Sequence, residues 1–294
     1  MKGPQSHHPY AMTTIFFWSL AYVFTRLTSQ VFSPSELGFL RYIIASAALA
    51  VVAAVTRMPL PRRADLGWFA AAGFTGFFLY MIAFNQGMLT LSSATGSVII
   101  ATVPMLTALM ARFVYGERLA PLQWLAILVE FCGVAVLTLL NGVFSVNGGI
   151  LLLMAAAVVL AIYNLLQRRL TRTYTALQAS TYSIFFGTAM LAVFAPKALQ
   201  QAAAAPPEQF LYLAVLGIGS SAIAYVCWAK AFEKARQTSQ VSNYMFLTPL
   251  LTSVIGFVVS GEVPERATLL GGLVIFAGLG LFKLGKPKAP AEET

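Results

Sequence analysis

Long apolar runs alternate with short polar segments along the whole chain. Ten such runs can be distinguished, at residues 10–27, 35–55, 66–84, 91–113, 123–140, 149–166, 178–194, 210–229, 241–259 and 268–282. Each run is continuously apolar, whereas a barrel strand would alternate between apolar and polar positions. Since a membrane helix needs ~20 apolar residues to cross the hydrocarbon core, the pattern predicts an all-α membrane protein with ten transmembrane helices.

The composition agrees with a chain embedded in a membrane. Of its 294 residues, 59% are hydrophobic and only 10% are charged, and the mean hydropathy is +0.77. A water-soluble globule needs a far more polar surface than this. The first run is preceded by one lysine and lacks a clear small-residue cleavage site, so we expect a retained helix and not a removed signal peptide.

The net charge of +9 could suggest a nucleic-acid partner, but the placement of the basic residues indicates membrane topology instead. If the amino terminus is cytoplasmic, fifteen of the nineteen Lys and Arg residues fall on the cytoplasmic side, and the remaining four are Arg26, Arg41, Lys197 and Arg266. This bias predicts ten spans in the cytoplasmic (inner) membrane with both termini in the cytoplasm. No nucleic-acid partner is expected.

The second half of the chain repeats features of the first. A shift of 145 positions superposes Tyr80 on Tyr225, Pro104 on Pro249, Thr107 on Thr252, Gly116 and Glu117 on Gly261 and Glu262, and Gly133 on Gly278. Matches in one register indicate duplication, which divides the chain into residues 1–147 and 148–294 with five helices each. Because five is odd, the repeats are predicted to be inverted. The turn after the eighth run is basic and the turn after the third is not, as inversion requires.

Three pairs of repeated residues suggest how the helices end and bend. Glycine at positions 116 and 261 can adopt the left-handed conformation that ends a helix, and Glu117 and Glu262 would then cap the fifth and tenth helices. A gating role for these carboxylates is the alternative. Pro104 and Pro249 lie inside apolar runs, where they are expected to kink the helix, and such kinks could let each half open one side of a central site.

Polar and aromatic side chains recur on single helix faces. In the first run, Thr14, Trp18, Tyr22 and Thr25 are spaced by four, four and three residues, which favours a face on a water-filled cavity over an interfacial belt. Similar stripes follow in other runs, where ordinary packing between helices is the competing interpretation. The candidate substrate-binding residues are Trp18, Tyr22, Tyr80, Phe84, Ser97, Tyr163, Asn164, Tyr225, Trp228, Asn243 and Tyr244.

These features resemble a known family. Ten helices in two inverted halves, and a repeated order of Pro, Gly-Glu and a Gly-bearing apolar helix, are similar to the EamA-type transporters of the drug/metabolite transporter superfamily. The segment "LTSQVFSPSELGFLRY", with Arg41 early in the second helix, also resembles that family's first repeat. The likeness extends from about residue 10 to 283. The aromatic stripes look most like those of bacterial aromatic amino acid exporters.

Two ionisable residues, Arg41 and Glu130, lie within predicted helices and are functional candidates by default. Arg41 is close enough to the outer interface to snorkel, and the resemblance implies a peripheral position for Glu130, so an ion pair or interfacial anchoring competes with proton coupling. The stretches expected to face the cavity contain no carboxylate. A cationic drug would need one, and a phosphorylated sugar would need deep Lys or Arg, so a neutral or zwitterionic substrate is favoured.

The sequence therefore predicts a transporter that exports amino acids, aromatic and other neutral ones, by alternating access around a central uncharged cavity. The alternative is a permease for a phosphorylated metabolite or nucleotide sugar, which would place Arg41 or Lys230 in the cavity. An integral membrane enzyme or sensor is disfavoured because His7 and His8 have no partner acid nearby. Cys132 and Cys227 form no metal or disulfide motif, so no cofactor is expected. The partners are a small-molecule substrate and the lipid bilayer; the oligomeric state stays open, and a monomer would suffice.

Overall fold

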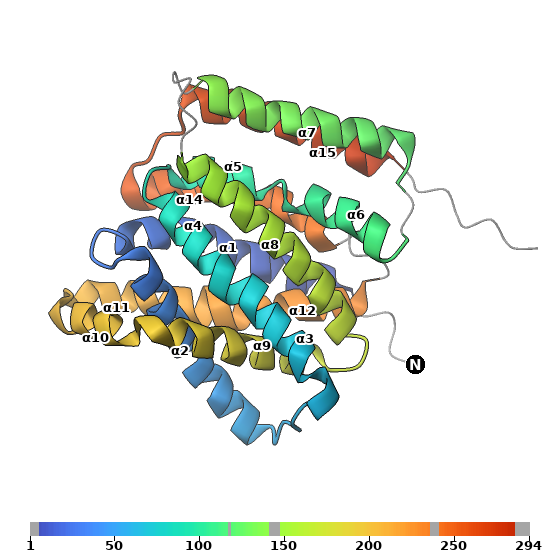
Figure 1. Ribbon diagram of the computed structural model, residues 1–294. Coiled ribbons are helices and arrows are strands. Elements are labelled where there is room, and N and C mark those ends of the chain that lie inside the picture. Colours follow the sequence, from blue (N-terminus) through green and yellow to red (C-terminus); the bar gives the residue numbers. More distant parts are fainter. Residues whose placement is uncertain (1–5, 117–118, 141–147, 236–240, 286–294) are drawn as a thin grey trace, which may run out of the picture.

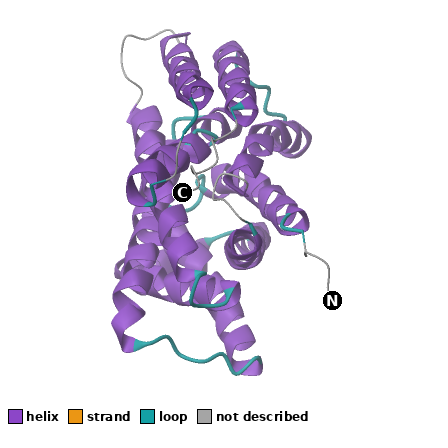
Figure 2. Ribbon diagram, turned by 90° about the vertical axis from the view of Figure 1, so that its right-hand side faces the viewer, coloured by secondary structure: helices purple, strands orange, loops and turns teal. Residues whose placement is uncertain are grey.

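The computed structural model describes residues 6–116, 119–140, 148–235 and 241–285, and these form helices and turns without a β-strand (Figures 1 and 2). The first half contains α1 (His8–Thr28), α2 (Pro34–Val55), η1 (Arg63–Asp65), α3 (Leu66–Gly73), η2 (Phe74–Leu79), α4 (Tyr80–Met88), α5 (Ser93–Ile100), α6 (Val103–Val114) and α7 (Pro121–Leu140). The second half contains α8 (Gly148–Leu170), α9 (Ala176–Leu191), η3 (Ala192–Phe194), α10 (Ala195–Ala204), α11 (Pro207–Ala214), η4 (Val215–Ile223), α12 (Ala224–Lys234), η5 (Asn243–Leu247), α14 (Thr248–Ser260) and α15 (Arg266–Leu284). The prediction of an all-helical chain is confirmed for these residues.

Six helical segments of the described chain are long and apolar enough to cross a membrane: Pro34–Val55, Arg63–Met88, Ser93–Val114, Gly148–Leu170, Ala176–Ala204 and Pro207–Lys234. Shorter apolar helices cover Pro121–Gly133, Thr248–Ser260 and Thr268–Phe282. Large apolar side chains such as Val55, Phe113 and Val193 are mostly exposed, as a lipid-facing surface requires. The molecule is thus a multi-pass membrane protein, while ten spans and the sidedness of the termini stay predictions.

The fourth and ninth apolar runs are each interrupted just before a proline. α5 ends at Ile100, and α6 begins three residues later, at Val103, with Pro104 in its first turn. In the ninth run the 3-10 segment η5 gives way to α14, again with the proline, Pro249, in the first turn. Proline suits this position because the first N–H groups of a helix have no intrahelical acceptor. The two prolines therefore begin new helices at the interruptions.

The third and eighth runs each contain a widened, π-helical stretch. η2 separates α3 from α4, and η4 separates α11 from α12. A shift of 145 places the first stretch on residues 219–224, which overlap the second. Such wide turns are frequent at functional sites, and both lie next to the tyrosines that the repeat aligns.

The glycines of the two Gly-Glu pairs end α6 and α14 as predicted. Gly116 and Gly261 both have φ +67°, which costs glycine nothing because it has no Cβ. At the end of α14, the Gly261 N–H donates to the Phe257 carbonyl (3.1 Å) and the Glu262 N–H to the Gly256 carbonyl (3.2 Å). These bonds satisfy carbonyls that the helix would leave without a partner.

The predicted cap of the tenth helix by Glu262 is wrong. The N-cap of α15 is Glu265, which makes no side-chain cap bond. Because the left-handed turn folds the chain back, the Glu262 side chain lies against Gly256, 3.7 Å from a Cβ placed there. Its carboxylate instead accepts bonds from the backbone N–H (3.1 Å) and hydroxyl (3.2 Å) of Ser93, at the start of α5. Glu117, the partner residue in the repeat, lies outside the described residues.

Helices α7 and α15 pack side by side along one edge of the molecule, at the top of Figure 1. A Cβ on Gly133 would lie 2.6 Å from Ile275, and one on Gly278 would lie 2.6 Å from Glu130. Ile275 and Gly278 stand 145 positions after Glu130 and Gly133, so each helix presents its glycine to the same position of the other. This reciprocal, antiparallel contact is the pattern that a two-fold relation between repeats produces.

Candidate functional site

A cavity in the middle of the bundle is enclosed by helices from both halves of the chain. α1 passes through the centre and contacts α4, α5, η4, α12 and α14. The cavity is lined by Trp18, Ala21 and Tyr22 of α1, Arg41 of α2, Tyr80 and Phe84 of α4, Ser97, Ile100 and Ala101 at the end of α5, Leu160 of α8, Tyr225 of α12, Met245 of η5 and Thr248 of α14. Six of the eleven predicted substrate-binding residues are among them: Trp18, Tyr22, Tyr80, Phe84, Ser97 and Tyr225.

The cavity is small in this conformation. The centre of a water molecule can occupy a volume of about 20 Å³, whereas a single water requires roughly 10–15 Å³ on this measure. An amino acid therefore fits in this cavity only if neighbouring helices or side chains move apart.

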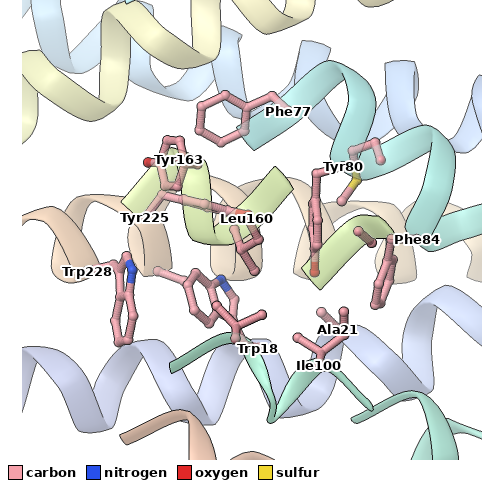
Figure 3. Close-up of a cluster of buried hydrophobic side chains, with 14 of the residues drawn as sticks. Trp18, Ala21, Phe77, Tyr80, Phe84, Ile100, Leu160, Tyr163, Tyr225 and Trp228 are labelled. Atoms are coloured by element: carbon pink, nitrogen blue, oxygen red, sulfur yellow. The ribbon is translucent and has the colours of Figure 1, made fainter. Parts of the chain in front are cut away.

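One side of the cavity is an aromatic cluster that joins α1, η2, α8 and α12 (Figure 3). The Trp18 ring lies 5.1 Å from Tyr225 and 4.9 Å from Trp228, measured between centroids. Behind them, Phe77 lies 4.9 Å from Tyr225 and 5.2 Å from Tyr163. Most of these contacts are edge-to-face, a geometry that stabilises the cluster beyond the burial of its area.

The opposite side is formed by three rings. Phe84 lies 5.3 Å from both Tyr22 and Tyr80, edge-on to the first and stacked on the second. In Figure 3, Tyr80 and Phe84 stand across Leu160 and Trp18 from the Tyr163, Tyr225 and Trp228 group. The two aromatic groups thus face each other over the cavity.

Residues related by the repeat line the cavity in pairs. Tyr80 and Tyr225 are 145 positions apart, and so are Ile100 and Met245. The first pair follows the π-helical stretches, and the second lies at the interruptions that precede the two prolines. Each half therefore contributes an irregular helical segment and a cavity-lining residue at corresponding positions.

Asn164 does not reach the cavity. Its amide donates to the Thr107 hydroxyl (3.2 Å) and accepts from the Trp228 indole N–H (3.1 Å). Asn164 and its two partners are fully buried, so the polar groups that its buried amide requires are supplied by the protein and not by a ligand. Asn164 and Trp228 support the wall of Trp18, and Tyr163 stands behind that wall, packed on Gly76.

Of the remaining two candidates, Asn243 and Tyr244, only Tyr244 can be placed, and it does not line the cavity. The side chain of Asn243 lies outside the described residues. Tyr244 packs against the rings of His7 and His8, and its hydroxyl is hydrogen-bonded to His8 Nδ1. It joins the start of α1 to η5.

Arg41 is the ionisable candidate that the sequence interpretation misplaced. It lies seven residues after Pro34, about 10 Å along the helix axis, and it is only 3% exposed. Its Nε donates to the Ser221 hydroxyl at 2.5 Å, and the side chain lines the cavity. The predictions of snorkelling and of an uncharged cavity are therefore wrong at this residue, because α2 packs against η4 and buries the guanidinium.

The other lining residues absent from the predicted substrate-binding set are Ala21, Ile100, Ala101, Leu160, Met245 and Thr248. Apart from Thr248 these residues are apolar. An apolar residue in an apolar run is equally compatible with a position facing the cavity, the lipid or the protein core, so the sequence does not distinguish these positions.

Glu130 lies away from the cavity, between α7 and α15. It is buried, and its two carboxylate oxygens have no hydrogen-bond partner within the described chain, so the proposed ion pair is not formed there. Within the same ranges, no group of three or more His, Cys, Asp or Glu residues could hold a metal ion.

Comparison with known proteins agrees with this architecture. The model of the EamA-like transporter family matches residues 6–139 and again 147–284. The chain is 30% identical over 268 residues to a probable terminal-alkyne amino-acid exporter of Streptantibioticus cattleyicolor, covering 91% of this chain and 90% of the relative. It is also 30% identical to the uncharacterized transporter YdfC of Bacillus subtilis, covering 89% and 86%.

More distant matches extend the same picture. An S-adenosylmethionine uptake transporter of Rickettsia prowazekii is 25% identical over 198 residues, covering 67% of this chain and 65% of the relative. A solved crystal structure, 21% identical, superposes with a TM-score of 0.65 over 96% of this chain and 98% of its own, which shows a shared fold. With both halves matching one family model and two relatives at 30% identity, this chain belongs to the EamA-like transporter family and is a membrane transporter.

Proposed function

We propose that the protein exports amino acids, aromatic and other neutral ones, by alternating access of two inverted halves around the central cavity. Both termini lie in the cytoplasm in this proposal, and the membrane is the cytoplasmic one. The observation that carries it is the cavity wall, where aromatic side chains from both halves face each other and no carboxylate is found among the described lining residues.

The chemistry of the wall favours a substrate with a flat apolar group and no net positive charge. Ring faces of Trp18, Tyr80 and Tyr225 can stack on an aromatic side chain. A cation taken out of water would require a carboxylate partner, which the described lining lacks. The name of the Streptantibioticus relative, an amino-acid exporter, supports the same substrate class.

Alternating access requires parts of each half to move while others stay packed. The interruptions before Pro104 and Pro249 border the cavity, and the wide turns η2 and η4 precede the cavity-lining residues Tyr80 and Tyr225. The aromatic cluster and the α7–α15 pair are closely packed and suited to move as units. In the closed conformation, opening on either side would admit or release the substrate.

A second candidate function is favoured by one observation, the position of Arg41 in the cavity. A permease for a phosphorylated metabolite or nucleotide sugar needs positive charge at the site. The described lining, however, contains one arginine and no lysine, while a phosphate group carries up to two negative charges. Lys230 pairs with Glu233 at 2.6 Å and does not line the cavity, so the amino-acid proposal fits better.

The test is flux through purified protein in liposomes. Labelled phenylalanine or tryptophan loaded inside should exchange with unlabelled amino acid added outside, and protein-free liposomes should show no exchange. A labelled sugar phosphate measured in parallel tests the second candidate. Absence of flux for every neutral amino acid tried would discard the substrate assignment and leave the family membership untouched.

A further inference from the structure

Arg41 presents a buried positive charge to the cavity without an acidic partner. The described chain contains no ion pair to its guanidinium; its contacts are the bond from Nε to Ser221 and the ring of Tyr42, 5.7 Å from Cζ to the centroid. The two terminal nitrogens, with four N–H donors, have no acceptor among the described residues. An uncompensated buried charge is costly, and an anionic group in the cavity would offset that cost.

The bond to Ser221 also orients the group. Because Nε is occupied by the hydroxyl, the two terminal nitrogens remain as the free edge of the planar guanidinium. That edge matches a carboxylate, which accepts two parallel hydrogen bonds. Ser221 belongs to the wide turn η4, so the orientation of the guanidinium depends on that turn.

The charge is contributed by one half only. α2 passes η4 so closely that a Cβ on Gly217 would lie 3.0 Å from the Arg41 carbonyl oxygen. The corresponding helix of the second half, α9, passes Gly73 of the first half in the same way: a Cβ on Gly73 would lie 2.8 Å from the Ser183 carbonyl oxygen. Ser183 thus takes the place of Arg41, and its hydroxyl donates to the Ala179 carbonyl. A single fixed cation suits one carboxylate and not a doubly charged group.

The other polar groups on the cavity wall are neutral. They include the hydroxyls of Tyr22, Tyr80 and Thr248, and the Thr248 Oγ1 has no partner in the described chain. Hydroxyl oxygens and ring faces can bind an ammonium group. The wall therefore offers complementary positions for the two ends of a zwitterion.

We propose that Arg41 binds the α-carboxylate of the substrate through its terminal nitrogens and thereby selects amino acids over their amides and amines. This inference rests on the proposed export of amino acids and assigns the residue that recognises the group common to all of them. The side-chain preference resides elsewhere, in the aromatic wall.

The experiment compares phenylalanine with phenylalaninamide as inhibitors of labelled phenylalanine exchange in liposomes, and as ligands in thermal-shift measurements on the purified protein. The wild type should prefer the acid by about tenfold or more, because hydrogen bonds to a charged group are roughly twice as strong as neutral ones. In Arg41→Gln the acid should lose affinity and the ratio should fall to near one. Arg41→Lys keeps the charge without the planar edge, so an intermediate ratio is expected.

Arg57→Gln is the matched control, since Arg57 follows the end of the same helix and is exposed. It should keep the wild-type ratio. An unchanged ratio in Arg41→Gln, or an equal loss of acid and amide, would overturn the assignment and indicate that Arg41 only joins α2 to η4. A wild type that moves no neutral amino acid would instead refute the proposed function, and that result is visible before any variant is compared.

Discussion

Glu262 and Arg26 form an ion pair at one end of the helix bundle, with Glu262 Oε1 3.0 Å from Arg26 Nε. The same carboxylate binds the first turn of α5 through Ser93, and Arg26 Nη1 donates to the Leu91 carbonyl at 2.5 Å. One carboxylate thus joins the end of α1, the start of α5 and the turn after α14. Tyr22, one helical turn before Arg26, lines the cavity, so we expect this three-way contact to help close the cavity at that end.

Replacing Glu262 by Gln should loosen this closure. The amide keeps the size of the side chain but removes the ion pair and the favourable charge at the start of α5. Because the Arg26 side chain is 41% exposed, the pair contributes modestly, and the open state should gain about two- to fivefold in population. The measurement is labelling of Ser97→Cys by a membrane-impermeant thiol reagent, in a background without the two native cysteines.

Glu208→Gln is the control for this labelling, because Glu208 is an exposed acid in the first turn of α11. It should leave the labelling rate unchanged. If Glu262→Gln also labels at the parent rate, the ion pair has no part in gating.

The two cavity tyrosines should respond differently to truncation. Tyr80→Ala removes a ring that lines the cavity and stacks on Phe84, so it should reduce transport with a smaller loss of thermal stability than Tyr225→Ala. Tyr225→Ala should reduce transport and also lower the melting temperature, because its ring is packed against Trp18, Phe77 and Tyr163 and truncation of a large buried ring costs about 3–5 kcal/mol. Exchange rates and melting curves of both variants, with normal membrane expression verified, test this. Parent-like transport in both would make them packing residues.

Asn164 and Trp228 should be energetically coupled. Asn164→Leu leaves the indole N–H and the Thr107 hydroxyl without their partner, and each unsatisfied buried group costs about 1–3 kcal/mol. In a Trp228→Phe background the same change should cost less, since one of the two groups is already gone. A double-mutant cycle on melting temperature measures the coupling; strictly additive effects would contradict the hydrogen bond.

The glycines between α7 and α15 should tolerate no side chain. Gly278→Ala places a methyl group 2.6 Å from Glu130 Cγ, so the helices must separate and the melting temperature should fall. Gly280→Ala, two residues further along α15, meets nothing within 4 Å and should be neutral or slightly stabilising because alanine favours helix. An equal effect of the two substitutions would argue against close packing at Gly278.

The apolar runs predict the helices of this molecule well, because lipid forces every backbone group of a span to be satisfied within the span. Trp18 and Tyr22 can be identified as cavity residues from the sequence. Each ring carries a polar group in the middle of an apolar run, far from the membrane interfaces, and that group requires polar surroundings inside the protein. Periodicity shows which residues share a face but not how deep that face lies. Tyr163, Asn164 and Trp228 share the correct faces yet stand one layer behind the cavity.

The wide turn η2 explains another difference. The regular spacing of Gly73, Phe77, Tyr80 and Phe84 predicts one face, but the extra residue of a π-helical turn breaks that register. Phe77 accordingly packs on Tyr163 and Tyr225 and is absent from the lining. Arg41 was misplaced for a related reason. The sequence shows how far Arg41 lies from the start of α2, but its burial depends on a tertiary contact with η4, which the sequence pattern does not show.

The matched stretches Phe74–Leu79 and Val215–Ile223 have a mechanical consequence. A widened turn can move along its helix when neighbouring backbone N–H groups change their carbonyl acceptors. Each such step rotates the side chain at the turn about the helix axis by about 100°, the angle per residue at 3.6 residues per turn. Tyr80 directly follows the first stretch, and Tyr225 stands two residues beyond the second. In the proposed transport cycle, we expect these two stretches, one per half, to let Tyr80 and Tyr225 change orientation beside the cavity while the ends of both helices stay packed.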